Sequence, residues 1–235
     1  MSTLTTEKYT QISQDGEKSF KEGTAKTIGP VETWPLAWRD EYHVAVYFDE
    51  SSNKLIKDIA IELLKSIALQ NNADYWFAEE AFPIHATMVS GYKEVDGKIL
   101  EGTRETQEAY LSMINDSVFK KISAEIKNII ISFDDILITG DNVILTASEI
   151  PLRILNFRNS VSDLEKINGL IPKTLDNILH VTIGRLKQIP DDEDSRIRFI
   201  DAFQGLRALI ASNPITVITS SVFNGRNMMS RKEDL

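Results

Sequence analysis

The sequence predicts an α+β fold in which one architectural unit is repeated. From residue 41 onward, segments with strand character alternate with long amphipathic segments of helical period. A strand, a long helix and a histidine-bearing strand follow one another in both halves of the chain. Residues 139–142 (TGDN) separate two strand-like segments and favour the tight turn of an antiparallel hairpin. The halves share little sequence beyond one short motif, so the repeat is one of architecture.

Six segments are predicted to be strands, because β-branched and aromatic residues dominate them and turn-forming residues bound them. They are residues 41–48, 82–92, 129–138, 143–147, 179–186 and 215–223. The first reads EYHVAVYF, and the second is entered through Pro83. Successive side chains of a strand point to opposite faces of a sheet, so residues two apart share a face.

Four segments have apolar residues at helical spacing and are predicted to be helices. They are residues 54–68, 104–126, 152–167 and 192–211. Residues 49–53 supply capping side chains before the first helix, and Gly169 closes the third. The last helix begins among acidic residues, which complement the positive end of the helix dipole.

The composition limits the classes of function. The chain has 235 residues, of which 42% are hydrophobic and 26% charged, so a buried core is feasible. The absence of cysteine excludes disulfides, thiolate metal sites and cysteine nucleophiles, and it fits a reducing setting. No apolar run is long enough to span a membrane, and residues 1–14 do not read as a secretory signal. We therefore expect a cytoplasmic monomer with no membrane contact.

Two of the three histidines stand in the same short pattern, His-x-Thr-x, within predicted strands. The first motif is residues 85–88 (HATM), and the second is residues 180–183 (HVTI). In a strand, each histidine shares a face with the threonine two residues later, while the apolar residues of the motif point to the core. The pattern therefore predicts two matching polar faces, each with an imidazole and a hydroxyl.

Two imidazoles are suited to the cleavage of a phosphodiester. One can deprotonate the attacking oxygen and the other can protonate the leaving oxygen near neutral pH. If they lie on opposite sides of one phosphorus, they allow in-line displacement without a metal. A threonine hydroxyl beside each imidazole can hydrogen-bond a non-bridging phosphate oxygen and stabilise the charge of the transition state.

Other interpretations of the motifs remain open. A single His-x-Thr pattern has little meaning, because a histidine in a strand is more often packed structure. The repetition of the pattern at corresponding places of the two halves favours a shared function. A zinc site is the chemical alternative, and it needs a third ligand that only His43 among the histidines could supply.

The two motifs resemble those of the two-histidine (2H) phosphoesterase superfamily, which includes LigT-like RNA 2′-5′ ligases and cyclic phosphodiesterases. Gly184 and Arg185 follow the second motif, where family members often carry a small residue and then arginine. The hairpin of residues 129–147 and the helix of residues 152–167 also fall where the family places them. The resemblance covers about residues 41–223.

The resemblance implies two pseudo-symmetric lobes around a central cleft, each an antiparallel sheet with outer helices. It implies attack on a phosphodiester, commonly a 2′,3′-cyclic phosphate or a 2′-5′ linkage, without a metal or cofactor. The implied catalytic residues are His85, Thr87, His180 and Thr182. Which histidine is the base and which the acid stays open. Two features depart from the family pattern: the segment before residue 41 is longer than in minimal members, and basic residues for RNA are sparse.

The chain is predicted to have three parts. They are an N-terminal extension of residues 1–40, the two-lobed domain of residues 41–224 and a charged tail of residues 225–235. Residues 28–38 contain two prolines and two tryptophans, and they are predicted to pack their rings on the domain. The alternative is that these residues form a flap beside the substrate cleft.

Four further residues are candidates for substrate binding. Tyr92 and Arg185 follow their motifs, so Tyr92 could stack on a base and Arg185 could pair with a phosphate. Tyr47 and His43 share a face of the first strand and would contact substrate if that face looks into the cleft. The structural alternative for each is a partly buried strand residue or, for Arg185, a surface ion pair.

The principal functional hypothesis is a metal-independent phosphodiesterase. A non-catalytic protein that binds a nucleotide or an RNA end is an alternative from another class, but such a protein needs no acid–base pair. An enzyme that joins RNA ends through a 2′-5′ bond needs a basic rim. The net charge of −9 disfavours that alternative and the binding of long nucleic acid. We therefore expect a small nucleotide or a short oligonucleotide as the substrate.

Overall fold

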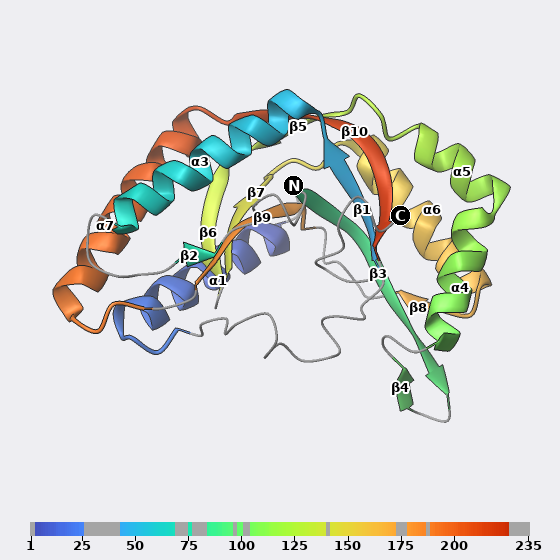
Figure 1. The fold of residues 1–235 in the computed structure, drawn as a ribbon, viewed down its shortest axis with the longest axis horizontal. Helices are drawn as coiled ribbons and strands as arrows, with labels where there is room; N and C mark the ends of the chain where they lie inside the picture. The colour runs from blue at the N-terminus through green and yellow to red at the C-terminus, as the bar shows by residue number, and fades with distance from the viewer. Residues whose placement is uncertain are drawn as a thin grey trace.

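Two antiparallel sheets curve into an arch (Figure 1). Along its outer side lie α3 (Glu50–Ala68), α4 (Arg104–Asn115), α5 (Ser117–Ala124), α6 (Leu152–Ile167) and α7 (Glu193–Ser212). The computed structural model describes residues 3–25, 43–68, 75–76, 84–95, 98–100, 104–139, 142–172, 178–186 and 189–225. We call the side of each sheet that packs against the main hydrophobic core the outer face and the opposite side the inner face. The arrangement confirms the predicted α+β class and the expectation of antiparallel sheets with outer helices.

Sheet A has six strands, and all of its pairs are antiparallel. Its main order is β4–β3–β1–β10–β5, and β8 also pairs with β3. The strands are β1 (His43–Phe48), β3 (His85–Val95), β4 (Lys98–Leu100), β5 (Ile130–Phe133), β8 (Ile171–Pro172) and β10 (Ile215–Gly225). The strand of the first histidine motif therefore lies beside the central strand β1.

Sheet B has four antiparallel strands in the order β2–β9–β7–β6. They are β2 (Tyr75–Trp76), β6 (Asp135–Thr139), β7 (Asn142–Thr146) and β9 (His180–Leu186). The pairing of β6 with β7 runs from Asp135 opposite Thr146 to Thr139 opposite Asn142. The predicted hairpin is thereby confirmed, and the second histidine motif lies on the strand next to it.

The long helices connect the two sheets. α3 (Glu50–Ala68) leaves β1 of sheet A and packs against β10, β9 and α7 (Glu193–Ser212). α6 (Leu152–Ile167) leaves sheet B and packs on β3 and β8 of sheet A, beside two further helices. Those are α4 (Arg104–Asn115) and α5 (Ser117–Ala124). The helix that precedes the second motif thus covers the sheet that carries the first.

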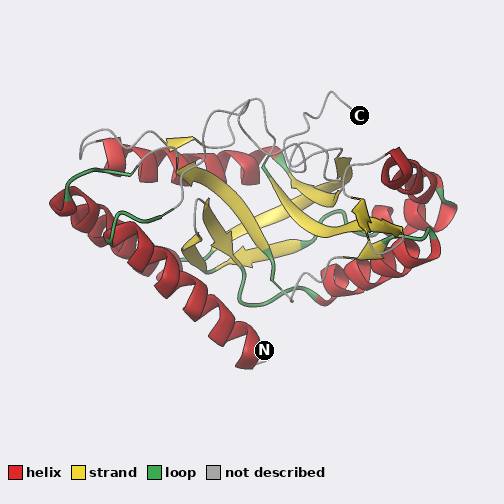
Figure 2. Ribbon diagram, turned by 90° about the horizontal axis from the view of Figure 1, so that it is seen from below, coloured by secondary structure: helices red, strands yellow, loops and turns green. Residues whose placement is uncertain are grey.

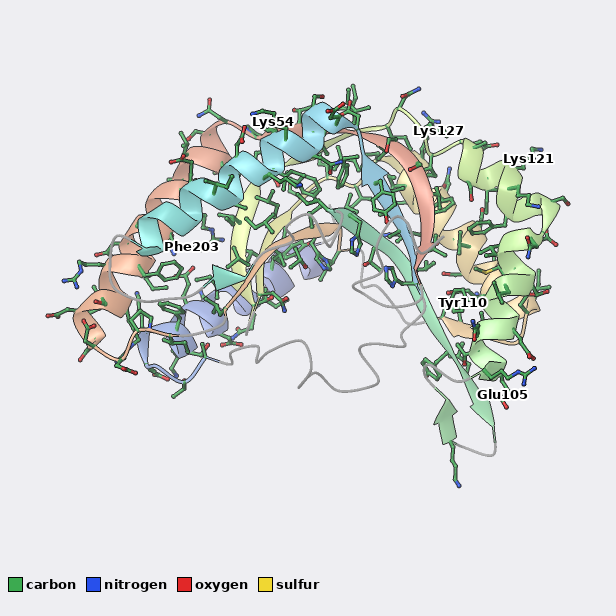
Figure 3. All side chains as sticks on the ribbon, viewed as in Figure 1. Lys54, Glu105, Tyr110, Lys121, Lys127 and Phe203 are labelled. Atoms are coloured by element: carbon green, nitrogen blue, oxygen red, sulfur yellow. The ribbon has the colours of Figure 1, made fainter. Side chains whose placement is uncertain are left out.

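The main hydrophobic core lies between the outer faces and these helices. Ala86 and Met88 of β3 and Val181 and Ile183 of β9 are buried in it, as the strand pattern predicts. Tyr110 of α4 and Phe203 of α7, labelled in Figure 3, are fully buried members of the same core. The core therefore fixes the orientation of both motif strands, because their apolar residues must point into the core on the outer face of each sheet.

An N-terminal helix, α1 (Thr3–Lys21), lies where the sequence suggested only an extension. It packs against β6 and α7, and Figure 2 shows it running from the N-terminus along one end of the molecule. The rings of Phe20 and Phe199 lie 4.4 Å apart between their centroids. The Arg207 guanidinium of α7 donates to the Ser13 hydroxyl of α1 at 2.7 Å. These contacts to distant parts of the chain stabilise a helix that local sequence did not indicate.

Two predicted elements are divided in the structure. The predicted strand of residues 129–138 is wrong as one element, because β5 belongs to sheet A and β6 to sheet B. The break falls at Asp134, whose carboxylate accepts from the backbone N–H and the hydroxyl of Ser148. The predicted helix of residues 104–126 is divided at Asp116, which caps α5 by accepting from Val118 N at 2.6 Å.

Other helix boundaries agree closely with the sequence. α6 has the predicted bounds, and Gly169 adopts a positive φ of 70° just after it. α3 begins earlier than predicted, because Asp49 caps it by accepting from Ser52 N. The short strands β2, β4 and β8 were not predicted. Residues 28–38, residues 140–141 of the hairpin turn and the tail from residue 226 lie outside the described residues. None of the helices described here combines the length and hydropathy needed to cross a bilayer.

Candidate functional site

The two His-x-Thr motifs begin strands β3 and β9, which contact each other where the sheets meet. His85, Thr87, His180 and Thr182 are all partly exposed, whereas the residues that alternate with them are buried in the main core. The four polar side chains therefore lie on the inner face. This placement brings two stretches of chain that are distant in sequence to neighbouring strands with the same orientation of their polar residues.

Strand pairing gives the two histidines comparable surroundings. In sheet A, Tyr47 of β1 lies opposite His85. In sheet B, Thr146 of β7 lies opposite His180. The register of both ladders shifts within a few residues of the motif, as at a β-bulge. Bulges bend a strand and redirect its side chains, so the two motifs share a local backbone irregularity as well as a sequence pattern.

His180 occupies an environment that disfavours its charged form. Burial, the positive charge of Arg158 and the His85 ring together lower the pKa of His180 to about 4. His85, on the neighbouring strand of the other sheet, adds the smallest contribution to this shift. His180 is therefore neutral at physiological pH in the absence of a ligand, which is the form of imidazole that can accept a proton.

The His85 ring stacks against a second imidazole, that of His43. The rings of His43 and His85 are stacked, with centroids 5.4 Å apart and an angle of 20° between their planes. His43 is only 2% exposed, and Tyr47, opposite His85, is 5% exposed. Burial raises the pKa of the Tyr47 hydroxyl. The structure thus places two of the predicted substrate-binding residues, His43 and Tyr47, on the inner face. Both are buried neighbours of His85 with little exposed surface.

The other two predicted binding residues lie farther along their strands. Tyr92 is partly exposed and pairs with Ile171 of β8. It lies seven positions after His85, a rise of roughly 23 Å along β3, so the structure does not bring these two residues together. Arg185 pairs through its backbone with Trp76 and with Asn142. The side chain of Arg185 lies outside the described part of the structure.

Arg158 of α6 is a site residue that the sequence analysis did not identify. It is only 7% exposed, and it acts electrostatically on His180. Burial lowers the pKa of its guanidinium to about 10, which leaves it positively charged at neutral pH. A signal was present in the sequence, because Arg158 falls on the same helical spacing as the buried residues Ile154 and Val161. A charge on the apolar stripe of a helix is uncommon unless it has a role.

A cavity elsewhere in the molecule does not include the two motifs. It has a volume of about 470 Å³ and lies at the edge of sheet B, between α1, β6 and α7. Arg207 lines it, but its guanidinium is engaged by both oxygens of Asp135, at 2.7 and 2.8 Å, which raises the pKa of Arg207. Because that positive charge is neutralised, the cavity has no evident attraction for a phosphate. Among the residues that the structure describes, no three His, Asp or Glu side chains are grouped as metal ligands.

Comparisons with known proteins find similarity only among solved structures. Neither the scan of protein-family models nor the search of curated proteins gives a match. The chain is similar to the MHV ns2 PDE domain, with 10% identity and a TM-score of 0.42, over 63% of this chain and 85% of that one. It is also similar to Kluyveromyces marxianus Usb1 in a structure with uridine monophosphate (12% identity, TM-score 0.43) and in a second structure (13%, 0.42). Each of these two matches covers 81% of this chain and 99% of the Usb1 chain. Similarity at this level assigns no activity, so the site itself must support any function.

Proposed function

We propose that this protein is a phosphodiesterase that uses His85 and His180 as an acid–base pair on one phosphate. The observation that supports this most strongly is the convergence of the two motifs. The neighbouring strands β3 and β9 of different sheets each present an imidazole and a threonine hydroxyl on the inner face. A packed structural histidine would not need a second copy of its motif on a neighbouring strand.

The proposed reaction is an in-line hydrolysis of a cyclic phosphate. His180, neutral in the resting protein, takes a proton from water, and the water oxygen forms a new bond to phosphorus. The bond from phosphorus to one ribose oxygen breaks, and His85 gives its proton to that oxygen. The product is a phosphomonoester, and each histidine ends in the protonation state in which the other began. The low pKa of His180 keeps its imidazole in the unprotonated form that a base requires.

Thr87 and Thr182 have a supporting role in this proposal. Each hydroxyl shares a strand face with its histidine, so each can donate a hydrogen bond to a non-bridging phosphate oxygen. Two such donors hold the phosphate between the imidazoles and stabilise the extra negative charge of the transition state. His43, stacked on His85, limits the orientations that the acid can adopt.

The proposed substrates are nucleoside 2′,3′-cyclic phosphates, 2′-5′-linked nucleotides or the end of a short RNA. The acidic chain, with a net charge of −9, does not offer a long basic surface, so a small substrate fits better than a long nucleic acid. Two imidazoles and two hydroxyls suffice for the acid–base chemistry, and the proposal accordingly requires no metal.

The test is a product-resolved assay of the purified protein in EDTA against nucleoside 2′,3′-cyclic phosphates and 2′-5′-linked oligoadenylate. Turnover is expected to persist in EDTA and to fall by roughly 10²- to 10⁴-fold in His85→Ala and in His180→Ala. Gly205→Ala is a suitable control, since an added Cβ there meets no atom within 4 Å. Activity that survives both histidine substitutions would exclude the proposed mechanism.

A further inference from the structure

Arg158 is a buried cation on a helix whose other buried residues are mostly apolar. The buried positions of α6 are Ile154, Phe157, Arg158, Val161, Leu164 and Glu165. Moving a guanidinium from water into the protein interior is unfavourable unless hydrogen bonds and charges compensate. The contacts of Arg158 therefore show what its burial achieves.

The guanidinium of Arg158 joins the strands of the two motifs. Its Nη2 donates to the carbonyl oxygen of Thr87 at 3.3 Å and to that of Ile178 at 2.8 Å. Thr87 belongs to β3 of sheet A and to the first motif. Ile178 lies two residues before His180, in the segment that leads into β9 of sheet B. One nitrogen atom thus bridges the backbones on which both motifs are built.

The charge of Arg158 is not neutralised by a carboxylate. Among the described residues, none of the ion pairs includes Arg158, and its Nε and Nη1 are buried without a hydrogen-bond partner. Asp134 and Asp135 act electrostatically on Tyr9. Each has another partner, because Asp134 accepts a hydrogen bond from Ser148 and Asp135 accepts one from Arg207. The uncompensated positive charge therefore acts on the inner face, where the proposed phosphate would bind.

Two titratable side chains interact electrostatically with Arg158. Tyr9 of α1 interacts with the guanidinium, and burial raises the pKa of Tyr9 to about 12, so its hydroxyl stays neutral. His180 of β9 interacts with both Arg158 and His85 of β3. Among the described residues, Arg158 is thus a positive charge that acts on His180 and forms no ion pair with a carboxylate.

We propose that Arg158 is a positioning residue of the catalytic site, a buried cation that fixes strand β3 to the segment leading into β9 and so holds the two histidine motifs in register. The catalytic part of this inference rests on the proposed function. We class Arg158 as a positioning residue because its Nε and Nη1 are buried and its Nη2 binds two backbone carbonyls. Arg158 acts through the two backbone carbonyls that it binds. Its positive charge also favours a bound anion and disfavours the protonated form of His180.

The test is a titration of the three histidines by NMR in the wild type and in three variants, with the resonances assigned from single histidine substitutions. In Arg158→Gln, which removes the charge, the pKa of His180 should rise by about one pH unit. In Arg158→Lys, which keeps the charge, it should stay near the wild-type value. Arg153→Gln, which changes an exposed arginine of the same helix, should leave it unchanged. If a phosphodiester is cleaved, Arg158→Gln should also lose roughly 10- to 100-fold in kcat/KM.

The titration needs no turnover, so it separates this inference from the proposed function. An inactive wild type would refute the phosphodiesterase, whereas an unchanged His180 titration in Arg158→Gln would refute the role of Arg158. Should Arg158→Gln not fold, hydrogen exchange at Arg158 in the wild type still decides. The Nη2 protons of Arg158 should exchange with water more slowly than the Nη protons of exposed Arg153, because Nη2 binds two backbone carbonyls. Equal exchange rates, or an ordinary His180 pKa in Arg158→Lys, would overturn the inference.

Discussion

His180 is the residue whose protonation state most directly determines the proposed reaction. Burial, Arg158 and His85 lower its pKa to about 4, so it is neutral and able to act as a base throughout the physiological range. The acid limb of the kcat/KM profile should therefore be centred near pH 4, well below the ordinary histidine value of about 6.5. Initial rates on a nucleoside 2′,3′-cyclic phosphate between about pH 3.5 and 9 would measure it. An acid limb centred near 6.5 would show that His180 is not desolvated in this way.

Glu165, the second charged residue on the buried stripe of α6, affects stability instead of chemistry. Burial raises its pKa to about 7, although the Tyr110 hydroxyl, which donates to its Oε1 at 2.6 Å, opposes the shift. The folded protein holds a proton there that the unfolded chain releases above about pH 4.5. Glu165 therefore makes the protein less stable as the pH rises from 4.5 to 7, by about 3 kcal/mol in total.

The substitution Glu165→Gln should abolish this loss, because the amide stays neutral and its oxygen can still accept from Tyr110. The low pKa of His180 gives the opposite slope between about pH 4 and 6.5, so the difference between variant and wild type isolates Glu165. Denaturant unfolding at a series of pH values should show a variant that gains up to about 3 kcal/mol relative to the wild type between pH 4.5 and 8. Glu108→Gln, at an exposed ion pair with Arg104, is the control. Parallel curves for the wild type and Glu165→Gln would contradict the assignment.

The residue pattern of α6 shows what could and what could not be predicted from the sequence. The spacing of its apolar residues predicted the helix bounds, and the same spacing marks Arg158 and Glu165 as buried. It does not reveal what a buried charge contacts. The partners of Arg158 are backbone carbonyls of two other segments, and a carbonyl oxygen leaves no signature in the sequence.

At the level of elements, the docking of α1 depends on a glycine. A Cβ added at Gly16 would overlap the carbonyl oxygen of Ile138 in β6, which is backbone and has little room to move. Gly16→Ala should therefore destabilise the protein by about 1–3 kcal/mol, in spite of the higher helix propensity of alanine. Gly205→Ala, at an open position of α7, should instead stabilise it by about 0.5–1 kcal/mol. Thermal unfolding of both variants would check the pair, and a stabilised Gly16→Ala would mean that α1 does not pack on β6 in this way.

The strand elements show why sequence predicted most, but not all, of the sheets. The run of residues 129–138 is rich in β-branched residues throughout, so no local signal marks where the chain leaves sheet A for sheet B. The division is set by distant partners: Ser148 binds Asp134, and Arg207 binds Asp135. α1 escaped prediction for a comparable reason, since its stabilising contacts, such as that of Phe20 with Phe199, are far away in sequence.

At the level of the whole molecule, the repeated architecture brings the two motifs together. The recurrence of a strand, a helix and a histidine-bearing strand was visible in the sequence, and each repeat contributes one motif strand to a different sheet. The sequence did not show that α6 crosses from sheet B to cover sheet A. That crossing places Arg158 against both motif strands, so the site is a product of the arrangement of the sheets as much as of the motifs.

The most direct test of the central claim is to ask whether His85 and His180 respond to one bound anion. Titration of the wild-type protein with inorganic phosphate, followed through the assigned imidazole resonances, requires no knowledge of the natural substrate. Both histidines should shift along one binding curve with a single Kd, because one phosphate lies between them. A response of only one ring, or two curves with different Kd values, would contradict the account.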